Sequence, residues 1–256
     1  MSHVLPIDEN TSKRLVRDMN RQGFAVLENA FDAPALDGIQ QYVERQAARH
    51  KNQYFAYHGY AALADSALAA LGASAEFRAQ LDHLHQLGTG RAAASSEIYP
   101  VLRCVQGGSG RRESNAFHFD ATLLTVLVPI FTPQGDQERG DLMLFPNTRS
   151  VRSSVLFNAL EKAVFQNTLS RRLITWLIDK RWLKPVTLPV VPGNVYFFWG
   201  YRSLHANQPC HPQFRRATAL FHYGDPHAGS LTTRLILKFN QHRARKAVAK
   251  SSTEAS

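Results

Sequence analysis

The chain is poor in cysteine, with only Cys104 and Cys210 among its 256 residues. Two cysteines cannot build a disulfide framework or a four-cysteine zinc site, so we expect a reducing compartment. No stretch approaches eighteen uninterrupted apolar residues, which argues against a membrane-spanning helix. Residues 1–11 lack the apolar core of a signal peptide. The expected location is therefore the cytoplasm.

Acidic residues are also scarce, since Asp and Glu number 20 against 30 Lys and Arg. The resulting formal net charge of +10 favours an anionic partner. Most of this excess comes from residues 139–184, with nine basic residues against three acids, and from residues 234–256, with six against one. A composition of 44% hydrophobic and 20% charged residues excludes disordered, collagen-like and fibrous classes.

The order of the predicted elements indicates a mainly β protein with helices at one end. Helical periodicity begins near residue 12, with Thr11 and Ser12 as candidate caps, and returns at 34–50 and 60–87, with a break near Gly72. Short aromatic or β-branched runs predict strands at 24–28, 97–106, 116–131, 141–145, 185–191, 194–199, 216–223 and 234–239. Turns separate these runs, which favours an antiparallel sandwich or barrel over a doubly wound sheet.

We expect one domain over residues 1–240, followed by a flexible basic tail at 241–256. Within the domain, helices occupy 1–90 and the β core occupies 97–240. Residues 155–182 interrupt the core as a basic amphipathic helical insert.

Two interpretations of this insert stay open. In the first, a helix packs Leu169, Leu173 and Leu177 on the sheet and leaves its charges in water. In the second, the insert meets acidic lipid headgroups or a phosphorylated substrate, with Trp176 and Trp182 as interfacial anchors. The second interpretation allows peripheral contact with the inner membrane surface.

Several common catalytic motifs are missing, namely the nucleophile elbow, the phosphate-binding loop and the dinucleotide fingerprint. His118 and Asp120 are a better candidate, because residues i and i+2 of a strand share a face and can bind one metal. With His205 they would form the two-histidine, one-carboxylate set of non-haem iron(II) oxygenases. A His-x-acid triplet is expected about once by chance in this composition, so the triplet alone decides nothing.

The residues around His205 carry a resemblance. Residues 191–199, His205 and residues 214–218 resemble the second ligand region of iron(II)/2-oxoglutarate-dependent dioxygenases, particularly the phytanoyl-CoA dioxygenase-like family. That family shows a Pro-Gly-Asp-type turn, a hydrophobic strand, a histidine and an arginine about eleven residues later, where Arg216 stands. Asn194 departs from the pattern at the acid of the turn. The resemblance, which also covers residues 23–27 and 140–146, implies a double-stranded β-helix, a jelly-roll or cupin-like core.

By this resemblance, His118, Asp120 and His205 would bind Fe(II), and 2-oxoglutarate and O2 would be co-substrates. Arg216 and Thr218 would bind the distal carboxylate of 2-oxoglutarate, since guanidinium binds carboxylates in bidentate pairs. Adjacent strand residues point to opposite faces, and Arg216 shares a face with Thr218, so Arg216 is preferred to Arg215. His222 shares that face as well. Four candidates for the C1 carboxylate stay open: Gln106, Arg103, Thr125 and Asn207.

The resemblance implies hydroxylation of an unactivated C–H bond, with release of succinate and CO2. The basic composition favours an anionic small molecule, an acyl-CoA, a lipid or a lipopolysaccharide sugar as the substrate. The alternative is a catalytically inactive barrel that binds a membrane surface or nucleic acid through its positive charge. No nucleic-acid-binding motif accompanies the basic residues, so nucleic acid is not an expected partner.

Overall fold

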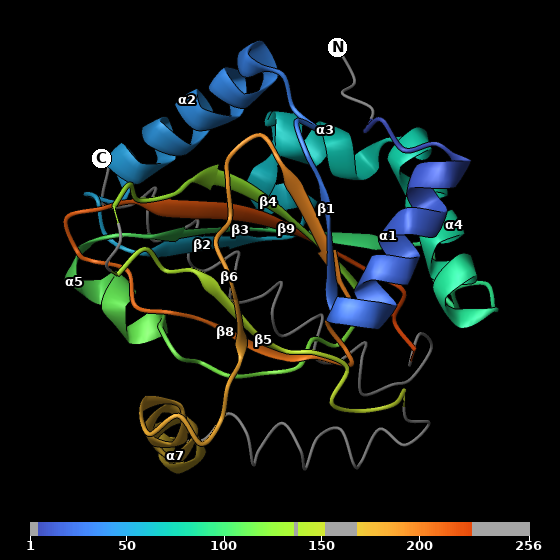
Figure 1. Ribbon diagram of the computed structural model, residues 1–256. Helices are drawn as coiled ribbons and strands as arrows, with labels where there is room; N and C mark the ends of the chain where they lie inside the picture. The colour runs from blue at the N-terminus through green and yellow to red at the C-terminus, as the bar shows by residue number, and fades with distance from the viewer. Residues whose placement is uncertain (1–4, 136–137, 152–167, 227–256) are drawn as a thin grey trace.

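Two antiparallel sheets lie at the centre of the protein, as seen in a computed structural model that describes residues 5–135, 138–151 and 168–226 (Figure 1). The larger sheet has the strand order β1-β7-β4-β9-β3-β2, and the smaller has the order β6-β5-β8. The strands are β1 (Phe24–Leu27), β2 (Phe55–His58), β3 (Ile98–Val105), β4 (Leu124–Phe131), β5 (Leu142–Phe145), β6 (Val186–Leu188), β7 (Val195–Phe198), β8 (Leu204–Asn207) and β9 (Arg216–Tyr223). This arrangement confirms the predicted mainly β, jelly-roll core with flanking helices.

Helices from the first part of the chain cover the outer face of the larger sheet (Figure 1). They are α1 (Glu9–Gln22), α2 (Ala33–Arg49), α3 (Ala67–Ala73) and α4 (Ala75–Thr89), with a short 3-10 turn, η1, at Tyr60–Leu63. Apolar helix positions such as Leu15 and Phe77 share one buried core with alternate residues of the strands. The ring of Phe77 meets that of Phe221 edge to face at 5.2 Å. The larger sheet is thereby fixed on a rigid helical layer.

The helix ends differ slightly from the predicted ones. Asp8 caps α1, because its carboxylate accepts a hydrogen bond from the Thr11 amide at 2.7 Å, so Thr11 lies inside the helix. The break in the predicted helical region at 60–87 falls at Ser74, whose hydroxyl caps α4 by accepting from the Phe77 amide. Gly72 stays helical, and a Cβ there would lie 3.1 Å from the Phe221 ring. That glycine therefore permits close packing of α3 on the sheet.

The two sheets face each other with alternate side chains between them. On the smaller sheet, Leu142, Leu144 and Leu188 point inward and form a buried cluster with residues of the larger sheet. The opposite face of the smaller sheet is covered by α7 (Thr168–Asp179), whose Ile174 packs with Met143. The space between the sheets holds the polar residues described below.

Two parts of the predicted element order differ from the structure. The segment predicted as a strand at 116–131 becomes regular only at Leu124, although His118 forms an isolated bridge with His205. β2, which pairs with β3 at the edge of the larger sheet, was not predicted. Two predicted parts lie outside the described residues, namely the strand at 234–239 and the tail at 241–256. The same holds for residues 155–167 of the insert.

Two short turns follow β3, namely α5 (Gly107–Gly110) and the 3-10 turn η2 (Arg111–Glu113). They lead into the segment that carries His118. Within the described residues, no helix has both the length and the apolar character needed to cross a membrane.

Candidate functional site

Two distant chain segments meet at His118 and His205. The backbone amide of His118 donates to the carbonyl of His205 at 2.9 Å, and the reverse bond measures 3.0 Å. Directly opposed residues of an antiparallel bridge carry their side chains on the same face, so the two imidazoles lie together. Their ring centroids are 4.4 Å apart. This bridge places both histidines between the sheets.

Backbone carbonyls fix the orientation of both imidazole rings. Nδ1 of His118 lies 2.8 Å from the carbonyl of Ala116, and Nδ1 of His205 lies 2.9 Å from the carbonyl of Ser203. A carbonyl only accepts hydrogen bonds, so each Nδ1 carries the proton and each Nε2 presents a lone pair. Histidine ligands of metals in proteins are commonly held in this way.

Asp120 completes the cluster. Its Oδ1 lies 3.7 Å from Nε2 of His118 and 3.6 Å from Nε2 of His205. The three residues offer ligand atoms that all lie within 4.8 Å of one another. Ligand atoms bound to one ion by bonds of about 2.0–2.2 Å are separated by similar distances, at most about twice the bond length. The residues present therefore fit a metal centre with two nitrogen ligands and one oxygen ligand.

The second oxygen of Asp120 is held by the protein itself. Thr125 donates its hydroxyl to Oδ2 at 2.5 Å, which leaves Oδ1 directed at the histidines. The amide of Asp120 donates to the carbonyl of Gly200 at 3.0 Å. A Cβ on Gly200 would lie 2.1 Å from Oδ2 and 2.3 Å from the Thr125 oxygen. Only glycine therefore leaves room for the carboxylate in this position.

The electrostatics favour a neutral His118 imidazole and an ionised Asp120 carboxylate, the forms that bind metals. Burial, reinforced by the nearby His205, lowers the pKa of His118 to about 3. Burial alone would raise the pKa of Asp120, but His205, His222 and His118 together hold it below its usual range.

Arg216 lies at the start of β9 with its side chain between the sheets, only 2% exposed. Its Nη2 donates to the amide oxygen of Asn207 at 2.9 Å, while its buried Nε has no partner among the described residues. Burial and the charge of Arg103 lower the pKa of Arg216 to about 10. Gly140, with φ of 75°, gives this side chain room, because a Cβ there would lie 2.6 Å from Cδ. A buried guanidinium with an unused donor fits the carboxylate of a bound ligand.

Arg103 and Thr218 are directly opposed in the pairing of β3 with β9. Their side chains therefore share the face that also carries Arg216. Arg103 forms an ion pair with Glu113 at 3.2 Å. Thr218 is 2% exposed, so its hydroxyl lies inside the barrel. The structure thus brings together Arg216, Thr218, Arg103 and Asn207.

Gln106 and Arg215 lie apart from this group. The side chain of Gln106 donates to the carbonyl of Gln53 at 3.0 Å and accepts from Nε of Arg215 at 2.9 Å. Arg215 also bonds Asn52. Both side chains serve the link between the end of β3 and the loop before β2, so the structure does not bring Gln106 to the histidines.

His222 lies closer to the cluster than the sequence indicated. It opposes Thr125 in the pairing of β4 with β9, and its Nδ1 is 3.7 Å from Oδ2 of Asp120. Its shared strand parity with Arg216 was the sequence signal for this position. Burial lowers its pKa. The role of Gly200 had no such signal, because it depends on the approach of Asp120.

Comparison by sequence gives no relatives, since no family model and no curated protein matches the chain. By structure, the chain is similar to a prolyl hydroxylase from Trichoplax adhaerens in complex with a hypoxia inducible factor peptide fragment. The TM-score is 0.52 at 16% identity, over 87% of this chain and 93% of that one.

Two further solved structures share the fold. A prolyl 4-hydroxylase from Phytophthora capsici has a TM-score of 0.55 at 14% identity, over 86% of this chain but only 64% of that one. The epimerase SnoN, in complex with Fe3+, alpha ketoglutarate and nogalamycin RO, has a TM-score of 0.53 at 16% identity, over 85% of each chain. At these identities the likeness concerns the fold.

Proposed function

We propose that this protein is an oxygenase that uses Fe(II) and 2-oxoglutarate. The observation that carries the proposal is the convergence of His118, Asp120 and His205 within 4.8 Å, in a barrel that also encloses Arg216. A facial set of two histidines and one carboxylate is typical of non-haem iron(II) oxygenases. Structures of the same fold include hydroxylases and an epimerase bound to Fe3+ and alpha ketoglutarate.

Nε2 of His118, Nε2 of His205 and Oδ1 of Asp120 would hold the iron. With 2-oxoglutarate and O2, iron supplies the oxidising power for attack on an unactivated C–H bond, and 2-oxoglutarate leaves as succinate and CO2. The protein contributes the orientation of the ligands. Carbonyls fix the tautomer of each imidazole, and Thr125 keeps Oδ2 occupied, so that one carboxylate oxygen faces the histidines.

Arg216 and Thr218 would bind the distal carboxylate of 2-oxoglutarate. Support comes from the unpartnered Nε and from Asn207, which holds one end of the guanidinium and leaves the other free. For the C1 carboxylate we favour Arg103, because its side chain shares the face of Thr218 and its charge acts on Arg216. Of the other three candidates, Gln106 lies apart from the histidines, the Thr125 hydroxyl bonds Asp120, and the Asn207 amide oxygen bonds Arg216.

Within this class of enzymes we place the chain with the phytanoyl-CoA dioxygenase-like family and expect an anionic substrate. The support is the pattern of residues 191–199 and 214–218 around His205, together with the net charge of +10. An acyl-CoA, a phosphorylated lipid or a lipopolysaccharide sugar would each carry the required negative charge. Contact of residues 155–182 with the inner membrane surface belongs to the same proposal.

The test is a titration of the metal-free protein with Fe(II) and 2-oxoglutarate without oxygen. A weak visible charge-transfer band should appear, and admission of air should yield succinate. His118→Ala should lose both signals because one of three ligands is gone. His83→Ala, at an exposed ion pair with Glu9, should keep both. Absence of both signals from the wild-type protein, or their survival in His118→Ala, would contradict the proposal.

A further inference from the structure

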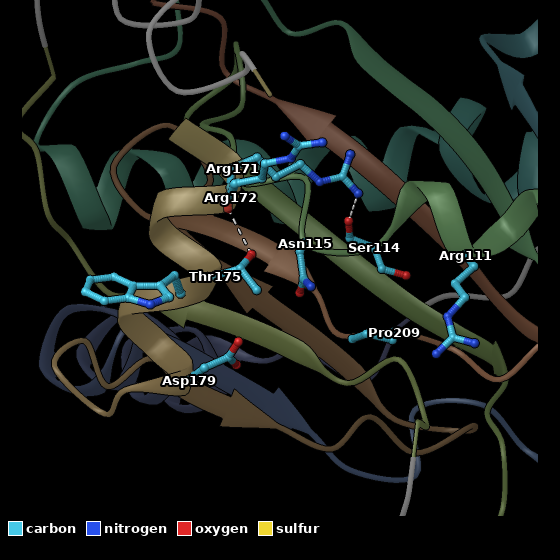
Figure 2. Close-up of a pocket in the computed structure, with 9 residues that line it drawn as sticks. Arg111, Ser114, Asn115, Arg171, Arg172, Thr175, Asp179 and Pro209 are labelled. Atoms are coloured by element: carbon cyan, nitrogen blue, oxygen red, sulfur yellow. Dashed lines mark hydrogen bonds between the residues drawn. The ribbon is translucent and has the colours of Figure 1, made fainter. Parts of the chain in front are cut away.

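A cavity of about 480 Å³ lies beside α7, outside the space between the sheets. One wall is α7 itself, and the other is formed by the segment after β3 and by Pro209 (Figure 2). Three arginines line it, Arg111, Arg171 and Arg172, against the single acid Asp179. A cavity with this balance of charge fits an anionic group.

The arginines come from both walls. Arg171 donates to the carbonyl of Ser114, which ties α7 to the opposite wall, as the dashed line in Figure 2 shows. Arg111 is paired with Glu138 at 2.6 Å, so its charge is partly offset. Arg172 is exposed, and no carboxylate lies within salt-bridge distance of it among the described residues. Arg171 and Arg172 thus add two guanidinium groups from α7 to the one that Arg111 brings from the opposite wall.

Hydrogen bonds link the wall of the cavity to residues of the candidate co-substrate site. The amide of Asn115, on the cavity wall, donates to the carbonyl of Asn207 at 2.8 Å, and Asn207 in turn holds Arg216. Ser114 precedes His118 by four residues, so their Cα atoms are at most about 14 Å apart. The backbone that borders the cavity therefore lies near the candidate iron ligands.

We propose that this cavity binds a phosphoryl group of the substrate, while another part of the same molecule reaches the iron. The inference rests on the function proposed above and names the substrate class, a phosphate ester. Arginine suits such a group because its planar fork donates two parallel hydrogen bonds to phosphate oxygens.

Asp179 and Trp176 determine which end of the cavity the phosphoryl group would occupy. Asp179 lies two turns along α7 from Arg171, about 12 Å at 1.5 Å per residue, so it repels a phosphoryl group toward the arginines. Trp176 is 46% exposed and lies between these two ends of the cavity. Its ring offers an apolar surface to the carbon skeleton next to the phosphate.

The experiment measures binding of phenyl phosphate, a phosphate monoester, to the full-length protein by calorimetry. Arg171→Gln/Arg172→Gln should weaken binding at least tenfold. Lys180→Gln/Lys184→Gln removes the same charge from residues that do not line the cavity and should change binding less than twofold. Asp179→Asn should tighten binding. Equal affinity in the wild type and the arginine double variant, or no binding to the wild type, would overturn the inference.

Folding and the source of the phosphate are controlled separately. The single variant Arg172→Gln, at an exposed position, should bind at least threefold more weakly with an unchanged melting temperature. Vesicles of phosphatidylcholine with phosphatidic acid should displace phenyl phosphate if the natural source is a lipid headgroup. A free phosphorylated metabolite is the source if the vesicles leave phenyl phosphate bound and glycerol 3-phosphate displaces it.

The iron and 2-oxoglutarate band of the same variants separates the two proposals. It should be unchanged in Arg171→Gln/Arg172→Gln, because these residues are not metal or co-substrate ligands. A normal band with no arginine-dependent phosphate binding contradicts the cavity alone. A missing band in the wild type contradicts the oxygenase function, whatever the phosphate result.

Discussion

Arg215 and Arg216 are adjacent in the chain, yet they meet different surroundings. Arg216 is buried between the sheets with a free donor, whereas Arg215 bonds Gln106 and Asn52. Arg216→Gln should raise the 2-oxoglutarate concentration at half-maximal succinate release by about 10- to 150-fold, since a charged hydrogen-bonded pair contributes roughly 1.5–3 kcal/mol. Arg215→Gln is the matched control and should leave this value within about threefold. The reverse ranking would refute the assignment.

Thr125 should matter for metal binding rather than for the co-substrate. Thr125→Val keeps the shape of the side chain but removes the hydroxyl that donates to Oδ2 of Asp120. Loss of such an outer contact typically weakens metal affinity by about 10- to 100-fold. Competition for Fe(II) with a chelator measures the effect, and Thr148→Val, at an exposed position, serves as the control. Unchanged iron affinity would show that Asp120 is positioned by other groups.

Gly200 permits the carboxylate of Asp120 to approach the backbone. In Gly200→Ala the new methyl would lie 2.1 Å from Oδ2, so the carboxylate must move away from the histidines. We expect iron binding to fall by at least tenfold in the chelator assay. Gly108→Ala, where a Cβ meets nothing within 4 Å, should bind iron normally. Normal iron binding by Gly200→Ala would mean that the site adapts to the methyl group.

These residues show what a sequence can and cannot reveal about such a site. Strand alternation correctly assigned Arg216 and Thr218 to one face, because period-two patterning is local. Thr125 was predicted as a candidate for the C1 carboxylate, whereas in the structure its hydroxyl bonds Asp120, which strand parity could not show. Gly200 carries no side chain, so its function exists only through the tertiary approach of another residue.

At the scale of elements, α4 is packed tightly against the strand end that precedes Gly200. A Cβ on Gly88 would lie 2.3 Å from two ring atoms of Trp199. Gly88→Ala should therefore destabilise the protein by about 1–3 kcal/mol, even though alanine favours helix. Urea unfolding measures the change. Gly38→Ala in α2, with nothing within 4 Å, should instead stabilise by about 0.5–1 kcal/mol. A stabilised Gly88→Ala would mean that the helix and Trp199 are loosely packed.

The elements that sequence patterns missed are those that depend on a neighbour. β2 has four residues, too short a run for its alternation to be distinctive, and among the described strands it pairs with β3 alone. Residues 116–123 alternate like a strand, since Phe117 and Phe119 pack outward and His118 inward, but their backbone pairing is limited to an isolated bridge and a few separate hydrogen bonds. Pairing, and not residue type, decides both cases.

At the scale of the whole molecule, stability should fall in acid. His85 is 8% exposed, packs against the Tyr223 ring, and has a pKa lowered by burial. The unfolded chain thus binds a proton on His85 more readily than the folded one, so stability is lost as pH falls below about 6.5. In urea unfolding of the metal-free protein, the free energy of unfolding should fall between pH 7.5 and pH 5.5. The fall should be smaller in His85→Gln than in the wild type, by at most about 1.4 kcal/mol. An identical loss in both proteins would contradict this.

The positive charge of the molecule is also unevenly distributed. Within the described residues, the barrel interior pairs Arg103 with Glu113 and leaves Arg216 for a carboxylate, whereas α7 carries Arg171 and Arg172 on its cavity side. Composition revealed the excess of charge but not these two separate places. By the two proposals above, the first place would bind the co-substrate and the second the substrate.

The bridge between His118 and His205 is a pair of reciprocal backbone hydrogen bonds between two distant chain segments, which the Asn115–Asn207 and Asp120–Gly200 backbone bonds also join. A metal held by both imidazoles would act there as a reversible cross-link and would close the long intervening loop, which lowers the entropy of the opened state. Amide hydrogen exchange at these two residues should then slow on metal loading. The ion would then stabilise the closed barrel in addition to serving as its reactive centre.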